Sequence, residues 1–300
     1  MNPSMSIKNW LIVTLLLINL PYVQSENPVE RIYPPHWWSG MTNPGLQLMI
    51  YGKNISGFDL KTENPYAKVM EIHKTSNSNY LFIDLLLKPD IKEGNIKLSF
   101  YNHPESPDFD YEYPIKRRRE KHAGHAGFDS GDAIYLITPD RFANGDTHND
   151  HIESMGDKVN RNQPDDRHGG DIRGIMNHLE YIKDLGFTAI WICPMLENKM
   201  PRTSYHGYAI TDFYKMDPRF GTNQLYREMV RHAHEMDLKI IMDVVLNHCG
   251  SHHWWMNDLP DNTWINHYQD TVYTHHKKSV ISDPHHSLAD LNEFADGWFV

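Results

Sequence analysis

A short run of mostly apolar and β-branched residues, Leu238 to Val245, ends in a group of polar side chains. Runs of this length and composition are typical of a strand that is covered on both faces of a parallel sheet. The polar group consists of a carboxylate, an amide and an imidazole, from Asp243, Asn247 and His248. Because parallel α/β folds collect their chemistry at the carboxyl ends of strands, we predict that this cluster meets solvent in a functional site.

The chain from residue 131 to residue 300 alternates between strand-like and helix-like segments. Strands are predicted at 133–137, 188–193 and 238–245, and helices at 172–185 and 223–236. In the first helix Asp171 takes the N-cap position and Gly186 follows the last turn. The order of elements predicts a parallel sheet with crossover helices. Three such units are too few to close a barrel, which needs eight.

Residues 26–115 have a different pattern, with short apolar or alternating runs separated by Gly, Asn and Pro. No helical period appears there, so we predict a small antiparallel β-sandwich. A linker, 116–130, joins it to the α/β part and carries a basic run. The formal net charge of −10 argues against a polyanionic partner, so no nucleic-acid binding is expected.

The first 25 residues are set apart by an apolar stretch. Lys8 precedes this stretch, which runs from Leu11 to Leu20, and a small-residue pattern ends at Ser25. We interpret 1–25 as a secretory signal peptide, with an uncleaved membrane anchor as the alternative. The stretch is short for a membrane span, which needs about 20 apolar residues. The protein is therefore expected to be exported, periplasmic or secreted, without stable membrane insertion after cleavage.

The cysteines and histidines give weaker signals. There are only two cysteines, Cys193 and Cys249, so the chain is no disulfide framework, and buried free thiols are favoured over a bridge. Three histidine pairs raise the possibility of zinc: 252–253, 275–276 and 285–286. None has the helical His-Glu-x-x-His spacing, so we interpret them as loop histidines.

The loop after the first predicted α/β strand is rich in oxygen-bearing side chains. Asn144, Asp146, Asn149 and Asp150 fall close together, and the segment 169–171 returns just before the first helix. Hard cations such as calcium take six to eight oxygen ligands, backbone carbonyls included. From the residues alone, a cation site and a simple Asn/Asp-rich turn are both open.

The Asp243 cluster follows the segment Ser204 to Tyr208 by about forty residues. With this order and spacing, the chain resembles the α-amylase family of glycoside hydrolases. The first signature region of that family reads Asp-x-x-x-Asn-His, and a His-Gly-Tyr motif accompanies it after strand two. The segment Pro34 to Met41 resembles the N-terminal domain of cyclomaltodextrinases and neopullulanases, in particular the Bacteroides-type periplasmic starch enzymes.

The resemblance implies the N-terminal part of a (β/α)8 TIM barrel over 131–300, ending inside the insertion that follows strand three. We expect a protein about twice as long. In this family a nucleophile Asp and a general acid Glu follow strands four and five, so both are expected past Val300. The implied activity is retaining hydrolysis of α-glycosidic bonds in starch-derived glucans, maltooligosaccharides or cyclodextrins. The alternative is a non-catalytic or degenerate glucan-binding protein that ends here.

The resemblance also implies roles for the two motifs. His206 and His248 are expected to donate hydrogen bonds to sugar hydroxyls, and Tyr208 to stack on the sugar. Asp243 is expected to orient an arginine of strand four. The alternatives are a loop cap for Asp243 and ordinary core packing for Tyr208. A homodimer through the N-terminal domain is a further expectation.

The same resemblance suggests roles for the loop and for the tryptophan pairs. The matching positions bind Ca2+ in related enzymes; here they are Asn144, Asp146, Asn149, Asp150, the Gly169 carbonyl and Asp171. Trp37-Trp38 is interpreted as domain packing rather than a sugar platform. For Trp254-Trp255 both interpretations stay open.

Overall fold

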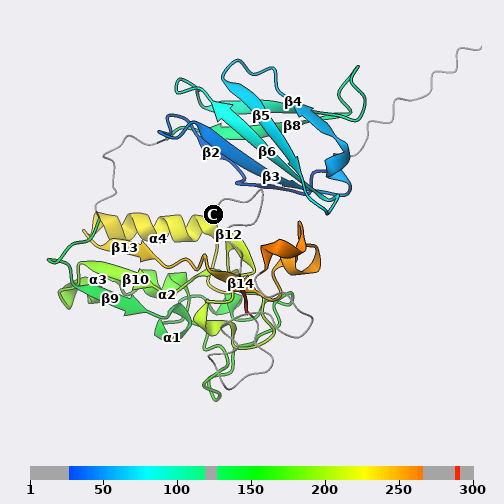
Figure 1. Cartoon of the computed structure of the whole chain (residues 1–300). Coiled ribbons are helices and arrows are strands. Elements are labelled where there is room, and N and C mark those ends of the chain that lie inside the picture. Colours follow the sequence, from blue (N-terminus) through cyan, green and yellow to red (C-terminus); the bar gives the residue numbers. More distant parts are fainter. Residues whose placement is uncertain (1–26, 119–126, 266–287, 291–300) are drawn as a thin grey trace, which may run out of the picture.

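The computed structural model describes residues 27–118, 127–265 and 288–290, which form a β-sandwich and an α/β part (Figure 1). The predicted signal peptide 1–25 lies outside the described residues, as do part of the linker and the histidine pairs 275–276 and 285–286. Within the described ranges, no helix has the length and apolar character that crossing a bilayer requires.

The sandwich is built from two four-stranded sheets. The first has the order β1 (Arg31–Tyr33), β3 (Gly45–Tyr51), β6 (Tyr80–Leu87), β5 (Ala67–Lys74). The second has the order β2 (Trp37–Trp38), β8 (Phe109–Lys116), β7 (Gly94–Tyr101), β4 (Asp59–Lys61). A 3-10 turn, Ile55–Gly57, precedes β4.

Alternation along the strands creates the core between the two sheets. On β6, Leu81, Ile83 and Leu85 are buried in that core, so the residues between them face outward. The expected antiparallel arrangement holds except where β2 runs parallel to β8. Parallel neighbours need a long connection, and most of the sandwich lies between these two strands in the sequence.

The α/β part contains a parallel sheet of three strands in the order β13, β10, β9. The strands are β9 (Ile134–Ile137), β10 (Ala189–Ile192) and β13 (Lys239–Met242), and helix α4 (Asn223–Glu235) precedes β13. The three predicted strands and the second predicted helix are confirmed. The third strand ends at Met242, earlier than the apolar run does, so Asp243 lies just beyond it.

The first predicted helix is broken in two, so the expectation of one continuous helix was wrong. It forms α2 (Ile172–Met176) and α3 (Leu179–Asp184). The His178 ring lies 2.7 Å from the Gly174 carbonyl oxygen, and the His178 amide donates instead to Ile175. The ring therefore takes the acceptor that a continuous helix would use. The predicted cap is present, since Asp171 accepts from the Gly174 amide at 2.6 Å.

Short elements fill the loops of the α/β part. They are α1 (Pro139–Phe142), η2 (Thr147–Asn149), β11 (Leu196–Glu197), η3 (Ser204–His206), β12 (Asp212–Met216), β14 (His248–Gly250), η4 (Trp254–Asn257), η5 (Asn262–Trp264) and β15 (Leu288–Asp290). Strands β11 and β12 pair with each other, and β14 pairs with β15. The sequence pattern did not reveal these pairs, because each strand has at most five residues.

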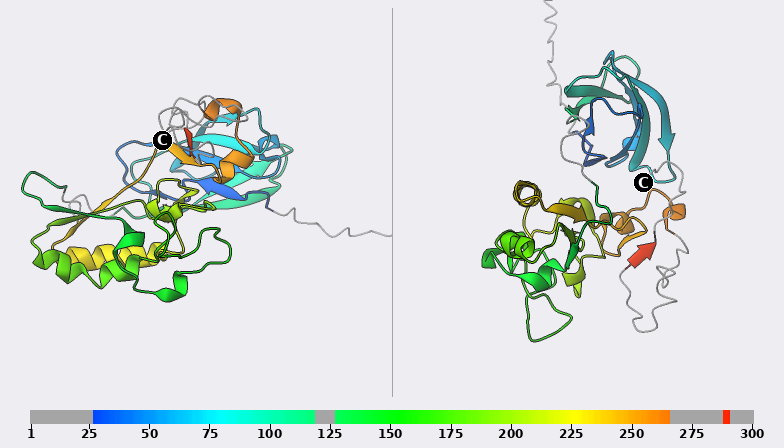
Figure 2. Two further views of the ribbon diagram at one scale, coloured as in Figure 1. Left: turned by 90° about the horizontal axis from the view of Figure 1, so that it is seen from below. Right: turned by 90° about the vertical axis from the view of Figure 1, so that its left-hand side faces the viewer.

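The segment 254–265 docks the α/β part onto the outer face of the first sandwich sheet (Figures 1 and 2). Trp255 and Trp264 pack in one buried cluster with Phe82 of β6. The Trp254 ring stacks on the Tyr80 ring with centroids 6.1 Å apart. The tryptophan pair 254–255 therefore serves domain packing.

Asp258 adds polar contacts to the same junction. Its carboxylate accepts hydrogen bonds from the Tyr51 hydroxyl at 2.9 Å and from the Asn79 amide at 2.8 Å. Asn77 also donates to this carboxylate, and the Tyr80 hydroxyl donates to the Asp258 carbonyl oxygen. One loop side chain thus joins three side chains of the sandwich.

Both cysteines are buried and free, as predicted. Cys193 follows β10 and Cys249 lies in β14. Trp37 of the other tryptophan pair packs against the sandwich core, in agreement with the packing interpretation.

Candidate functional site

One face of the three-stranded sheet is covered and the other is open. Helices α2, α3 and α4 bury the face that carries Ile137, Ile190 and Ile192. On the opposite face Leu136 and Trp191 remain exposed, at 59% and 42%. The loops at the carboxyl ends of these strands bring the two sequence motifs together over this open face.

Asp243 takes its position from the end of β13. Its amide donates to the Ile192 carbonyl oxygen at 3.3 Å, which extends the strand pairing by one residue. Its Oδ2 atom accepts from the Trp191 indole at 3.2 Å and from the Tyr208 hydroxyl at 3.1 Å. Two side chains from β10 and the following loop orient this carboxylate, which argues against a simple loop cap.

The His-Gly-Tyr motif turns sharply at its glycine. Gly207 has φ +81°, and a Cβ atom there would lie 1.9 Å from the Pro194 carbonyl oxygen. Only glycine combines a left-handed backbone conformation with so close an approach to another backbone atom. The turn places the His206 and Tyr208 rings nearly parallel, with centroids 5.9 Å apart.

His206 is held in one tautomer. The Tyr208 amide donates to Nδ1 of His206 at 2.9 Å, so the neutral ring carries its proton on Nε2. Burial lowers the pKa of His206, and the neighbouring His248 lowers it further. A neutral ring that carries its proton on Nε2 is able to donate a hydrogen bond to a ligand hydroxyl.

Tyr208 combines an exposed ring with an anchored hydroxyl. The residue is 36% exposed, so the core-packing alternative does not describe it. The hydroxyl donates to Asp243 and also lies 3.7 Å from the Cys193 sulfur. Burial of the hydroxyl raises its pKa, and Cys193 and Asp243 raise it further, so the phenol stays protonated.

His248 joins the same group through the backbone. Its Nε2 atom donates to the Tyr208 carbonyl oxygen at 3.0 Å, and Asn247 lies 3.3 Å from its Nδ1 atom. The structure therefore brings all four predicted residues together: His206, Tyr208, Asp243 and His248. In this arrangement His248 braces the Tyr208 backbone, whereas the sequence motif suggested a sugar hydroxyl as its acceptor.

The predicted calcium loop is also folded into one cluster. The Asn144 amide donates to Asp150 at 2.8 Å, and the Asn149 amide lies 3.4 Å from Asp171. Gly169 has φ +87°, and a Cβ atom there would lie 2.5 Å from the Asp150 carboxylate and 2.8 Å from the Asn144 amide. Asn144, Asp150 and Gly169 are thus in mutual contact, and Asn149 lies beside Asp171.

Two orphaned oxygens show that this cluster suits a cation. The side-chain carbonyl oxygens of Asn144 and Asn149 are buried and have no hydrogen-bond partner. A buried polar atom without a partner destabilises the fold unless an ion or a water satisfies it. Oxygen ligands of this type fit Ca2+, so the residues present fit the metal.

Two of the expected ligands have other contacts. The Asp171 carboxylate already accepts from the Gly145, Asp146 and Gly174 amides, so it orders the loop as well as capping α2. The Asp146 carboxylate accepts from the His148 amide at 3.0 Å, and its side chain is 45% exposed. The structure does not bring the Asp146 carboxylate to the orphaned oxygens.

Beneath these loops lies a buried ionic network that the sequence interpretation missed. Arg219 binds the Asp217 carboxylate at 2.8 Å and also donates to two backbone carbonyls. Burial alone would raise the pKa of Asp217, but the Arg219 guanidinium holds it below its ordinary value. Arg167 lies 3.4 Å from Asp140 and over the Phe220 ring. In the sequence Asp217 and Arg219 stand next to the apolar Phe220, and this was the available signal for a buried ion pair.

A cavity of about 880 Å³ lies between the outer sandwich face and the end of β13. Its lining is mostly apolar and includes Leu86, Phe213 and Met242. Neither Asp243 nor Tyr208 lines it, so the cavity is separate from the polar group described above.

Comparison with known families agrees with the fold. Residues 136–296 match the family described as "Alpha amylase, catalytic domain", and residues 31–119 match "Cyclomaltodextrinase, N-terminal". The chain therefore belongs to the α-amylase family. The predicted fold, a β-sandwich followed by the first β/α units of an amylase-type barrel, is confirmed.

Two characterised relatives illustrate the likeness. A cyclomaltodextrinase of Thermoanaerobacter pseudethanolicus is 37% identical over 49% of this chain and 26% of its own length. Neopullulanase 2 of Thermoactinomyces vulgaris is 36% identical over 47% of this chain and 23% of its own. The crystal structure of an Anoxybacillus α-amylase superposes with a TM-score of 0.45 and 37% identity, over 54% of this chain and 34% of that one. The chain spans about a quarter of the length of the cyclomaltodextrinase and of neopullulanase 2.

Proposed function

We propose that the whole protein hydrolyses α-glycosidic bonds in starch-derived glucans, maltooligosaccharides or cyclodextrins with retention of configuration. The observation that carries the proposal is the grouping of His206, Tyr208 and Asp243 at the carboxyl ends of β10 and β13. The names of the two relatives, a cyclomaltodextrinase and a neopullulanase, support this substrate class.

The geometry supports a positioning role for each of these residues. The exposed Tyr208 ring offers an apolar face on which a sugar ring stacks, because its hydroxyl is tied to Asp243. The Nε2–H of His206 donates to a sugar hydroxyl, because Nδ1 is already occupied. Interactions of this kind hold the scissile bond in place and stabilise charge as it develops.

Bond cleavage itself needs two further carboxylates. A retaining glycosidase uses a nucleophile and a general acid about 5–5.5 Å apart. The Asp243 carboxylate accepts hydrogen bonds from Trp191 and Tyr208 and lies over the open face of the sheet. This position suits a role in orienting an arginine of strand four. We place the nucleophile Asp and the acid Glu past Val300, on further strands that also cover the exposed Leu136 and Trp191.

Calcium is part of the same proposal. Enzymes of the α-amylase family commonly bind calcium. Asn144, Asn149, Asp150 and the Gly169 carbonyl are the residues that would hold the ion here, with Asp146 joining if its side chain turns inward. When bound, Ca2+ supplies positive charge that ties the loop after β9 to the start of α2. The ion would then stabilise the floor of the site without taking part in bond cleavage.

Export to the periplasm or the medium and a homodimer through the sandwich complete the proposal. Export is supported by the apolar segment near the N-terminus. Mass determination of the mature protein tests cleavage after Ser25.

Turnover by the longer gene product tests the proposed activity. We expect hydrolysis of maltooligosaccharides, and His206→Ala should lower kcat/KM by about 10² to 10³ because a transition-state donor is lost. The control is His103→Ala, which removes an exposed sandwich histidine and should leave the rate unchanged. Glucan binding without turnover by the longer protein would support the non-catalytic alternative and overturn the proposal.

A further inference from the structure

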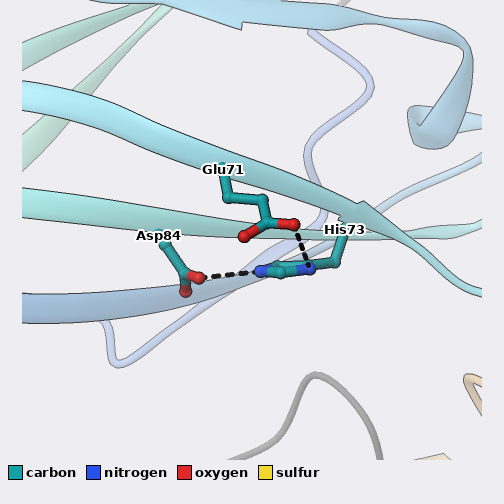
Figure 3. A group of neighbouring side chains, drawn as sticks. All are labelled: Glu71, His73 and Asp84. Carbon is teal, nitrogen blue, oxygen red and sulfur yellow. Dashed lines mark hydrogen bonds and ion pairs between the residues drawn. The ribbon is translucent and has the colours of Figure 1, made fainter.

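The first sandwich sheet carries a histidine between two carboxylates on its outer face. His73 Nε2 lies 2.7 Å from Oδ2 of Asp84, and its Nδ1 lies 3.7 Å from Oε1 of Glu71 (Figure 3). One ligand atom from each of the three residues lies within 4.8 Å of the others. In the part of the chain that the structure describes, no other group of three His, Cys, Asp or Glu side chains is this close.

We propose that Glu71, His73 and Asp84 form a zinc site that ties the edge strand β5 to β6. This inference goes beyond the proposed hydrolase activity and is independent of it. The three side chains come from two strands of a sheet that the folded sandwich holds rigidly, so their spacing does not depend on a loop.

A bulge in β5 creates the trio. Val69 pairs with Leu85 and Glu71 pairs with Asp84. A step of two residues along β5 therefore corresponds to a step of one residue along β6. In a regular strand Val69 and Glu71 would share a face. The extra residue, Met70, turns Glu71 and His73 to the outer face beside Asp84. Bulges of this kind re-aim side chains next to functional sites.

The pairing opposes two like charges. Glu71 and Asp84 are direct cross-strand partners, and carboxylates in that relation repel each other. In the described chain, His73 is the one basic side chain within ion-pair distance of either of them. A divalent cation would relieve this repulsion by binding both carboxylates and the imidazole.

The Gln47 side chain already orients one of the three proposed ligands. The Gln47 amide on β3 donates to Oδ1 of Asp84 at 2.9 Å, which leaves Oδ2 free to face His73. Such partners orient metal ligands and sharpen their affinity. The side chains of His73 and Asp84 are 33% and 35% exposed, so an ion reaches them from solvent.

The ligand set favours zinc among divalent ions. Zn2+ binds imidazole nitrogen together with carboxylate oxygen and often takes three protein ligands plus a water. Calcium and magnesium prefer oxygen ligands alone, so His73 disfavours them. The site is therefore chemically distinct from the oxygen-only loop around Asn144.

The experiment measures zinc binding by the full chain in the presence of excess calcium. We expect the parent to bind one more Zn2+ than His73→Ala, and Co2+ in place of zinc to give a visible absorption band in the parent but not in His73→Ala. Gln47→Ala should keep the site but weaken it by about 10- to 100-fold. The matched control, His103→Ala, replaces an exposed histidine of the same domain and should bind as the parent does.

A purely structural role for the trio predicts a different result. If His73→Ala lowers the melting temperature equally with and without zinc, and parent and variant bind equal zinc, the inference is wrong. The same holds if His103→Ala removes the extra ion. None of these outcomes depends on glucan hydrolysis, so the two proposals fail separately.

Discussion

The Tyr208 hydroxyl lies 3.1 Å from Oδ2 of Asp243, although 35 residues separate them in the sequence. This hydrogen bond joins the loop after β10 to the end of β13. It fixes the carboxylate on the open sheet face and at the same time leaves the tyrosine ring exposed. The two sequence motifs thus act as one structural unit.

Gly207 should be essential for that unit. Gly207→Ala would place a Cβ atom 1.9 Å from the Pro194 carbonyl oxygen, so the loop must move. Gly186→Ala is the matched control, since Gly186 has φ +90° but nothing within 4 Å of its Cβ position. The control should cost about 1 kcal/mol of unfolding free energy. Denaturant melts should show a clearly larger loss for Gly207→Ala; equal losses would contradict the close approach.

Asp258 should hold the α/β part on the sandwich. Asp258→Ala leaves the partly buried Tyr51 hydroxyl and Asn79 amide without this acceptor, and it removes one of the two acceptors of the Asn77 amide. We expect a loss of about 2–4 kcal/mol in unfolding free energy, because lost bonds to a charged group are costly. Asp90→Ala, on an exposed loop, is the control and should be neutral. A wild-type melt for Asp258→Ala would show that the junction does not depend on this residue.

His253 should make the protein sensitive to acid. Burial lowers the pKa of His253 from an ordinary value of 6.5 to about 3, with a smaller contribution from Arg31. The folded state keeps this ring neutral, whereas the unfolded chain binds a proton as pH falls through 6.5. The stability is therefore present above pH 6.5 and is lost below it, by up to about 1.4 kcal/mol per pH unit.

Unfolding measured from pH 7 to pH 4 checks this dependence. His253→Gln removes the titrating ring, so its free energy of unfolding should fall less steeply with acid than that of the parent. His103→Gln, at an exposed site, should keep the parental slope. Parallel pH profiles for the parent and His253→Gln would show that the buried ring does not titrate as described.

Calcium removal should destabilise the α/β part. If Ca2+ satisfies the orphaned oxygens of Asn144 and Asn149, it binds only the folded state. At a hundredfold excess over its dissociation constant it would add about 2.7 kcal/mol. A chelator should then lower the melting temperature by several degrees in scanning calorimetry.

Two variants and one control sharpen the calcium experiment. Asn149→Ala should abolish the response to the chelator, whereas Asn160→Ala, outside the cluster, should retain it. Asp146→Ala should abolish the response only if the Asp146 side chain turns inward to the ion. A response that survives in Asp146→Ala but not in Asn149→Ala would mean that the exposed Asp146 is no ligand. Identical melts of the parent with calcium and with chelator would leave only an Asn/Asp-rich turn.

Local signals in the sequence were sufficient for much of the fold. The strands around Ile190 and Ile240 were visible from apolar runs, but among the described residues one face of the sheet is open, so the predicted cover on both faces is not found there. The N-cap at Asp171 and the helix end at Gly186 could be predicted because both depend on local geometry. Asp171 accepts from an amide of the first helical turn, and Gly186 adopts a positive φ just past the last turn. The four motif residues were identified because their types, order and spacing resemble the motifs of the α-amylase family.

Other features depend on side-chain contacts that hydrophobic periodicity does not show, whether local or distant in the sequence. The break between α2 and α3 arises from His178, whose ring takes a backbone acceptor that periodicity does not reveal. The packing of Trp254 became clear only when Tyr80 was brought against it.

The candidate sites, like these features, could be predicted only in part from the sequence. The sequence by itself determined which residues can carry chemistry, since residue type and local spacing set donors, acceptors and charge. The tertiary structure decided which of them meet. It showed that His248 donates to the Tyr208 backbone and that the Asp146 carboxylate contacts His148. It also brought Glu71 and His73 to Asp84 through a bulge at Met70. The physical reason is that strand pairing and loop closure set distances between residues that no local pattern constrains.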